Sequence, residues 1–267
     1  MLALNRAQVD AAAVDISSGI AAWRLSRLLA WQDIKQRYRR STLGPVWLTI
    51  SSGIQMFTMG VLSAFLFNSS VERSLPFVCA GMLFWGLITQ IINEGAILFI
   101  SSAPFITQIK RPFTIFLVQA IWRNVIVAGH NSVTYIVIAL YLAVVPGRSM
   151  LLWPLALVLV LICVSWIALL SAIISARYRD VPVILQNVLA IIFWFTPLIY
   201  FPEQLGPRQY IVKYNPFTSL IALLREPLLG GTPTLRDWMI VLALTVAGWA
   251  MTFVFFARFR ARIAYWL

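Results

Sequence analysis

Residues 151–176, LLWPLALVLVLICVSWIALLSAIISA, contain no charged residue over their whole length. A helix needs roughly 20 consecutive apolar residues to cross the hydrocarbon core of a bilayer, and this run is long enough. Its apolar residues lack the alternation expected of a barrel strand. Because backbone groups in hydrocarbon must be hydrogen-bonded within their own segment, the run predicts a membrane-spanning helix.

Other apolar runs of similar length lie on both sides of this stretch. We expect spans near residues 46–67, 77–100, 114–145, 151–176, 183–201 and 238–257. At ~1.5 Å per residue, the run 114–145 exceeds a core of ~30 Å and must tilt or project from it. The sequence therefore predicts an all-α polytopic membrane protein with six transmembrane helices.

Composition and charge support the same class of protein. The chain is 61% hydrophobic and 11% charged, well beyond the apolar share of a soluble domain. If both termini are cytoplasmic, fourteen of the 21 Lys and Arg residues fall on the inner side and six on the outer side. Short loops rich in Lys and Arg mark the cytoplasmic side. We therefore ascribe the net charge of +12 to topology and lipid headgroups rather than to nucleic-acid binding.

The N-terminal part of the chain is more polar than the rest. Charged residues precede the first apolar run, so we expect no cleavable signal peptide. Residues 1–19 are expected to form a disordered tail, and residues 20–267 a single transmembrane domain. Within 20–40, Ile20, Trp23, Trp31, Ile34 and Tyr38 recur at helical spacing. This pattern predicts an amphipathic helix at the cytoplasmic membrane surface, or a basic anchor before the first span.

Two connecting segments carry helix signals. Prolines bracket residues 104–112, PFITQIKRP, between the second and third spans, and one or two helical turns fit between them. After the fifth span, Asn215 and Pro216 form an N-cap and first helical position, and a stop follows at Pro227. Residues 203–231 are thus expected to form short helices that dip back toward the membrane, or a surface cap.

Motifs for catalysis and for metal binding are missing from the sequence. It contains no GxxxxGK[ST] phosphate loop, no HExxH and no GxSxG. Cys79 and Cys163 both lie in apolar runs, where buried thiols are expected rather than a disulfide or a metal site. We expect a non-enzymatic transport subunit without a cofactor or metal, so any ATP would be bound by a separate polypeptide.

A few polar residues lie within the expected spans. Charges in hydrocarbon are costly unless they are paired, and Glu94 and Arg123 lie at similar distances from the hairpin tip near residue 108. We predict that they form an ion pair or share a polar network. Gln119, Arg123, His130 and Thr134 have spacings that place them on one helical face, with Asn124 and Asn131 beside it. This seam predicts helix packing or substrate contact.

The run WQDIKQRYRRSTLGPVW at residues 31–47, the pair His130-Asn131 and the segment 196–200, TPLIY, followed by Asn215-Pro216, resemble the permeases of ABC-2-type polysaccharide exporters. Those permeases serve O-antigen, capsule or teichoic acid. The resemblance implies a homodimer in the bacterial inner membrane that binds two copies of a separate ABC ATPase and exports a lipid-linked glycan, O-antigen being preferred. It matches 20–40 to an interface helix, 104–112 to a coupling helix and 203–227 to a periplasmic gate.

The resemblance also suggests roles for individual residues. ATPase coupling would fall to Phe105, Ile106, Ile109, Lys110 and Arg111. Because guanidinium pairs with phosphate oxygens, Arg37, Arg39 and Arg40 would bind the carrier's pyrophosphate or lipid headgroups, the alternative being that they only follow the positive-inside rule. Aromatic rings can stack on sugars, which makes Trp47, Phe57, Phe193, Trp194 and Tyr200 candidates for lining a channel. For these aromatic residues, core packing and interfacial belts are the alternative.

Other functions remain open on the sequence alone. Within the class, the substrate could be teichoic acid, capsule or a small lipophile. An ion-coupled secondary transporter or channel would need intramembrane carboxylates and an inverted repeat, whereas Glu94 stands alone in the spans and no repeat is visible. A membrane-embedded glycosyltransferase would need clustered acidic residues at the membrane surface, and none cluster here.

Overall fold

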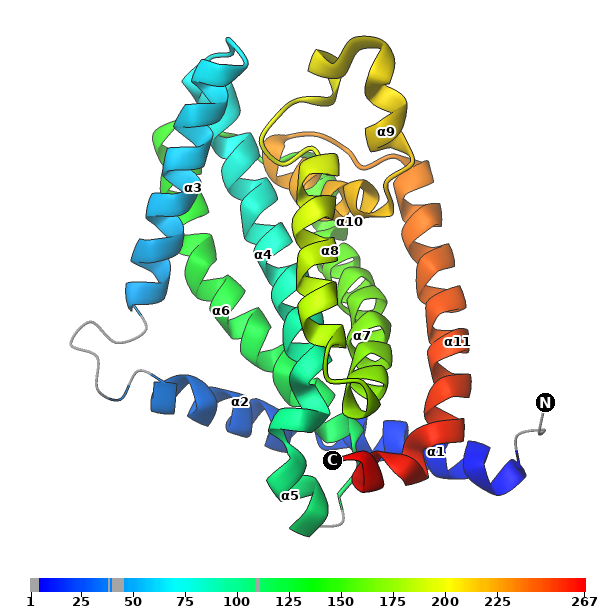
Figure 1. The fold of residues 1–267 in the computed structure, drawn as a ribbon. Helices are drawn as coiled ribbons and strands as arrows, with labels where there is room; N and C mark the ends of the chain where they lie inside the picture. The colour runs from blue at the N-terminus through cyan, green and yellow to red at the C-terminus, as the bar shows by residue number, and fades with distance from the viewer. Residues whose placement is uncertain (1–4, 38, 40–45, 109–110) are drawn as a thin grey trace.

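Long helices crossed by short ones make up the computed structural model, which describes residues 5–37, 39, 46–108 and 111–267. No strand occurs in these ranges, so the predicted all-α fold is confirmed. The helices that run along the bundle are α3 (Val46–Leu66), α4 (Val71–Ser101), α6 (Thr114–Tyr141), α7 (Trp153–Arg177), α8 (Val181–Phe195) and α11 (Leu235–Trp266) (Figure 1).

Helices α1 (Arg6–Ala21) and α2 (Trp23–Arg37) lie across one end of the bundle, next to the short helix α5 (Ala103–Gln108). We call these three helices the platform. The C-terminal end of α11 (Leu235–Trp266) also lies at this end of the bundle (Figure 1). The opposite end carries residues 196–231, which we call the cap. The cap consists of η2 (Pro202–Gln209), α9 (Tyr210–Lys213), α10 (Pro216–Arg225) and η3 (Glu226–Leu229).

Five helices in the described part of the chain are long and apolar enough to cross a membrane: α3, α4, α6, α7 with the preceding η1 (Arg148–Leu152), and α11. The chain is therefore a multi-pass membrane protein. The expected fifth span, 183–201, is shorter than predicted, because α8 ends at Phe195, two residues before Pro197. Its 15 residues cover only about 22 Å at ~1.5 Å per residue. Six full-length crossings are thus not confirmed.

Helix α4 forms the centre of the bundle and packs against α3, α6, α7, α8 and α10. Within its most apolar window, 72% of the residues are buried, the highest share among the five candidate spans. Gly95 of α4 allows close approach to α7, because a Cβ atom at this position would overlap Ala168. Small residues bring membrane helices together in this way when no water drives their association.

The expectation of a disordered tail at residues 1–19 is wrong for the described residues from Asn5 onward. The Asn5 side chain caps α1, which packs against α6 and α11. The buried residues of α1 are Ala12, Asp15 and Gly19, spaced three and four apart on one face. These residues are small or charged rather than apolar and large, so this face is not visible as a hydrophobic stripe in the sequence.

The Asp15 carboxylate is fully buried and joins three helices. Its two oxygens accept hydrogen bonds from the backbone amides of Phe113 (3.1 Å) and Thr114 (3.0 Å) at the start of α6. Arg260 of α11 donates to the same carboxylate at 2.7 Å. An acid at a helix N-terminus satisfies amides that lack partners within the helix and also the positive end of the helix dipole.

The predicted amphipathic helix corresponds to α2, but of the expected stripe only Ile34 belongs to its buried face among the described residues. Ser26, Ala30 and Ile34 are almost fully buried, and α2 packs against α6. Trp23 and Trp31 from the expected stripe are about 40% exposed. Small residues such as Ser26 and Ala30 occupy the buried face because α2 lies close to α6. Ser26 Oγ there donates to the Ile115 carbonyl.

Asp15→Ala is expected to destabilise the protein by about 2–3 kcal/mol, because two amides and a guanidinium lose their common acceptor. Arg260 is partly exposed and keeps some hydration, which limits the effect. Thermal unfolding in detergent measures the change. Asp10→Ala is the matched control, since Asp10 lies on the same helix and is exposed. Equal unfolding temperatures for the two variants would contradict this role of Asp15.

Candidate functional site

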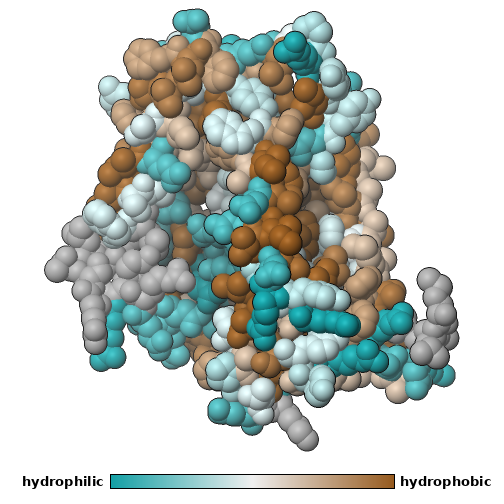
Figure 2. Space-filling view, viewed as in Figure 1, coloured by the Kyte–Doolittle hydropathy of each residue, from teal (hydrophilic) through white to brown (hydrophobic). Residues whose placement is uncertain are grey.

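A groove with a volume of about 390 Å³ runs between α3 and α8, with α4 as its floor. Its lining combines amide and hydroxyl side chains with aromatic rings. The principal lining residues are Gln55 of α3, Trp85, Thr89 and Asn93 of α4, and Gln186, Phe193 and Trp194 of α8. Figure 2 shows this face of the molecule, where hydrophilic residues lie between hydrophobic ones.

The polar residues of the groove lie on the candidate spans α3 and α4 and on the shorter apolar helix α8. Gln55 and Gln186 are exposed on the surface of the single chain. The side-chain oxygen of Asn93 is buried and has no hydrogen-bond partner among the described residues. Polar groups in a membrane helix face the bundle interior or a water-filled cavity, because lipid offers them no hydrogen bonds. The groove is therefore suited to water or to a polar guest rather than to lipid chains.

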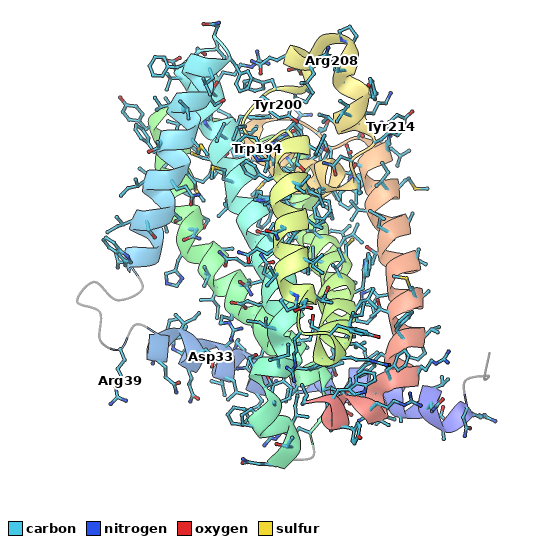
Figure 3. All side chains as sticks on the ribbon, in the orientation of Figure 1. Asp33, Arg39, Trp194, Tyr200, Arg208 and Tyr214 are labelled. Carbon is cyan, nitrogen blue, oxygen red and sulfur yellow. The ribbon has the colours of Figure 1, made fainter. Side chains whose placement is uncertain are left out.

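The aromatic rings gather around Trp85. Its ring meets those of Phe193 and Phe217 edge-on, with centroid distances of 5.9 and 5.8 Å. Phe193 in turn stands perpendicular to Trp194 at 5.3 Å. The hydroxyl of Tyr200, a cap residue, donates to the Trp194 carbonyl at 3.1 Å and so ties the end of α8 to the cap (Figure 3). The groove thus combines aromatic rings with amide side chains, and both groups can contact a carbohydrate.

Among the aromatic candidates from the sequence, Phe193 and Trp194 line the groove, and Tyr200 lies beside it. Trp47 and Phe57 lie on α3, about half exposed, and are not part of the lining. Sequence reasoning missed the other lining residues, Trp85 and the amides among them. Gln and Asn residues inside otherwise apolar runs were the available signal for these positions.

The cap is held by two polar side chains. Asn215 caps α10 through a 3.0 Å bond from the Phe217 amide, as predicted, and its own amide donates to Thr196 Oγ1 at 2.9 Å. Arg225 is 3% exposed and donates to the Pro197 carbonyl at 2.6 Å. Burial lowers the pKa of Arg225 to about 10, and Glu226 opposes this shift. The guanidinium therefore stays charged at neutral pH and ties α10 to the segment after α8.

A charged network joins the platform to the bundle. Arg123 of α6 bonds Glu94 of α4 at 2.8 Å and Asp33 of α2 at 2.6 Å. Asn124 also donates to Glu94 at 2.6 Å, and Gln119 donates to Asp33 at 2.8 Å. The predicted pair of Glu94 and Arg123 is confirmed. Asp33, which sequence reasoning did not include, extends the network to the platform (Figure 3).

The polar seam along α6 serves mainly to pack helices within the chain. Asn131 accepts a bond from Ser52 of α3 at 2.9 Å, and Thr134 Oγ1 donates to the Thr49 carbonyl at 3.4 Å. Within the described part of the chain, the His130 ring bonds to the Ile126 carbonyl of its own helix. The seam therefore divides, with its first half binding α2 and α4 and its second half binding α3.

The predicted coupling residues separate in the structure. Phe105 of α5 is 61% exposed, whereas Ile106 packs against the core. Arg111 and Phe105 both line a cavity of about 460 Å³ between α2, α5 and α6. Ile109, Lys110 and Arg40 lie outside the described residues. Arg37 ends α2, and Arg39 is exposed just beyond it (Figure 3).

The long apolar helices and the polar groove define a membrane transport protein. The chain belongs to the ABC-2 type transporter family, whose model matches residues 24–229. It is 24% identical over 238 residues to the O-antigen export system permease protein RfbA of Klebsiella pneumoniae, with 85% of this chain and 88% of that protein covered. A protein of the same name from Myxococcus xanthus is 25% identical over 204 residues, with 72% and 75% covered.

Replacing Arg123 by Met leaves the carboxylates of Glu94 and Asp33 without their cation, and should destabilise the protein by about 2–3 kcal/mol. Because the three residues act as one network, Asp33→Asn should cost less in the Arg123→Met background than alone. Unfolding of the four proteins in detergent tests this coupling. Lys35→Met, a change at an exposed position of α2, is the control. Strict additivity of the two substitutions would argue against a shared network.

Proposed function

We propose that this chain is the permease subunit of an ATP-driven exporter that moves lipid-linked polysaccharide, of the O-antigen type, from cytoplasm to periplasm. The observation that carries the proposal is the groove of amides and aromatic rings inside a membrane-spanning bundle. The names of the similar RfbA proteins point to the same substrate class. A sliding polymer requires many weak contacts, which rings and amides supply without a single tight site.

The groove favours a homodimer as the working unit. Gln55, Gln186 and Asn187 are exposed at levels of the bundle that would otherwise face lipid. A second copy of the chain placed against α3 and α8 would shield these amides and close the groove into a channel. Such an arrangement satisfies the demand that polar groups in hydrocarbon be hydrogen-bonded or hydrated.

The platform is the proposed docking surface for two copies of a separate ABC ATPase, which would bind ATP and Mg²⁺. Phe105 projects from α5 with its neighbour Ile106 anchored in the core, so a push on α5 would move α4 as well. Basic residues at this end, Arg24, Arg27 and Arg111 among them, support a bacterial inner membrane location with the platform and both termini on the cytoplasmic side. Arg39 beside the platform is available to a carrier pyrophosphate.

An ion-coupled transporter is disfavoured by the environment of Glu94. A carboxylate that carries protons or ions must exchange its partners, but Glu94 is bound to Arg123 and Asn124 within the bundle. Teichoic acid, capsule and small lipophiles remain alternative substrates of the same machinery. Export assays with each class of glycan in cells that express the chain and its ATPase distinguish them.

Gly86→Leu should reduce glycan export to a small fraction, because Gly86 lines the groove and a side chain there meets open space rather than protein atoms. Gly129→Leu is the matched control. A Cβ atom at Gly129 would also meet no other atom within 4 Å, but Gly129 lines a different cavity, between α6 and α7. Surface glycan and membrane levels of both variants are measured together. Normal export with Gly86→Leu would remove the groove from the transport path.

Phe105→Glu should uncouple ATP hydrolysis from export by weakening the platform's contact with the ATPase by about 2 kcal/mol or more. Phe105→Leu keeps an apolar side chain and should have a small effect. Co-purification of the ATPase and its stimulated activity in proteoliposomes provide the measurement. If the glutamate variant binds and exports like the leucine variant, α5 is not the coupling element.

A further inference from the structure

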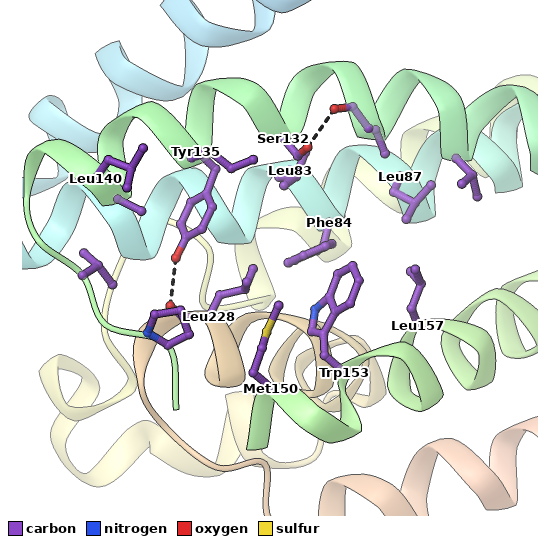
Figure 4. A pocket seen from close by; sticks show the side chains of 17 residues that line it. Leu83, Phe84, Leu87, Ser132, Tyr135, Leu140, Met150, Trp153, Leu157 and Leu228 are labelled. Carbon is purple, nitrogen blue, oxygen red and sulfur yellow. Dashed lines mark hydrogen bonds between the residues drawn. The ribbon is translucent and has the colours of Figure 1, made fainter. Parts of the chain in front are cut away.

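A second cavity, with a volume of about 500 Å³, opens between α6 and α7 in the half of the bundle nearer the cap (Figure 4). Both helices pack against α4 but diverge from each other, and Leu83, Phe84 and Leu87 of α4 form the floor between them. The lining follows α6 from Val125 to Leu140, which corresponds to about 22 Å along the helix. The cavity is therefore a slot that runs along the bundle.

The side chains that line the slot leave almost no free hydrogen-bond donor for a bound ligand. The three polar side chains of the lining already use their donors within the protein. Ser132 donates to the Gly129 carbonyl (2.7 Å), Tyr135 to Leu228 (3.0 Å) and Trp153 to Leu224 (3.1 Å). Among the residues that the structure describes, no charged side chain lines the slot. Apolar cavities exclude water, so the ligand that fits here is a hydrocarbon chain.

An exposed arginine, Arg148, lies close in the chain to residues that line the slot. Pro146 and Met150 belong to the lining, and Arg148 lies between them in the chain. Arg148 is exposed, and none of the five ion pairs among the described residues includes it. Tyr141, 87% exposed at the end of α6, marks the depth at which aromatic residues meet lipid headgroups.

We propose that the slot binds one acyl chain of an anionic phospholipid from the leaflet at the cap end, with Arg148 paired to its phosphate. The slot, about 22 Å along α6, is longer than half of a ~30 Å core, so an acyl chain of one leaflet fits within it. A lipid fits this face better than a second copy of the chain does, because its exposed residues are uniformly apolar. They include Val137, Leu140, Leu151, Leu155, Val158 and Ile162.

The test uses the full chain in phosphatidylcholine nanodiscs that contain phosphatidylglycerol with a photoreactive diazirine in one acyl chain. After illumination, mass spectrometry locates the adducts. We expect them to concentrate on the slot residues Leu87, Val125 and Leu157, and to exceed those on the lipid-facing residues Met251 and Val254 of α11. Gly129→Phe fills the slot from a position with free space and should remove the slot adducts while leaving those on α11.

Arg148→Gln should lower the slot adducts of phosphatidylglycerol by about fivefold, the contribution of one basic residue near an anionic surface. The same variant should leave the adducts of a diazirine-labelled phosphatidylcholine unchanged. Arg208→Gln, an exposed cap arginine away from the slot, is the control for charge and should change neither probe. Arg148 is a surface residue, so this measurement stands even if Gly129→Phe does not fold.

Two results would overturn the proposal. Equal labelling of the slot and of α11, unaffected by Arg148→Gln, would mean that ordinary annular lipid contacts this face. Adducts between two protein chains across α6 and α7, without lipid adducts in the slot, would show that a second copy covers it.

Discussion

A charge inside a membrane-spanning bundle must be paired, and Arg123 meets this requirement by binding carboxylates from two other helices. This one guanidinium joins α2, α4 and α6, so the position of the platform depends on a residue within the bundle. In the second network the shared group is an acid of the platform itself: the buried carboxylate of Asp15 in α1 binds groups of α6 and α11. Together these two networks hold the platform helices α1 and α2 against the bundle.

The same arrangement places the platform network next to the groove. Glu94 binds Arg123, while its neighbour Asn93 lines the groove between α3 and α8. Helix α4 therefore contacts the proposed docking surface, the proposed glycan path and the cap within a single element. A displacement of α4 would therefore move its contacts with the docking surface, the glycan path and the cap together, because packed helices shift as rigid units rather than deform.

The pairing of Glu94 with Arg123 could be predicted, because charges in apolar runs are few and the hairpin brings them to similar depth. The Asn215 cap of α10 followed from local chemistry as well. Asp33 and Asp15 were not predictable, since acids in polar segments normally face solvent. The short length of α8 was not predicted, because the apolar sequence continues from Phe195 to Phe201. The helix nevertheless ends at Phe195, two residues before Pro197.

The sequence by itself determined that this protein is helical and spans the membrane, since long uncharged runs leave no other way to satisfy the backbone in lipid. It also determined which helix ends and intramembrane charges need partners. Only the tertiary structure decided which partners they take, which residues face the groove, and that α1 is part of the fold. Those outcomes depend on contacts between residues far apart in the chain, such as Asp15 with Arg260, which no local pattern records.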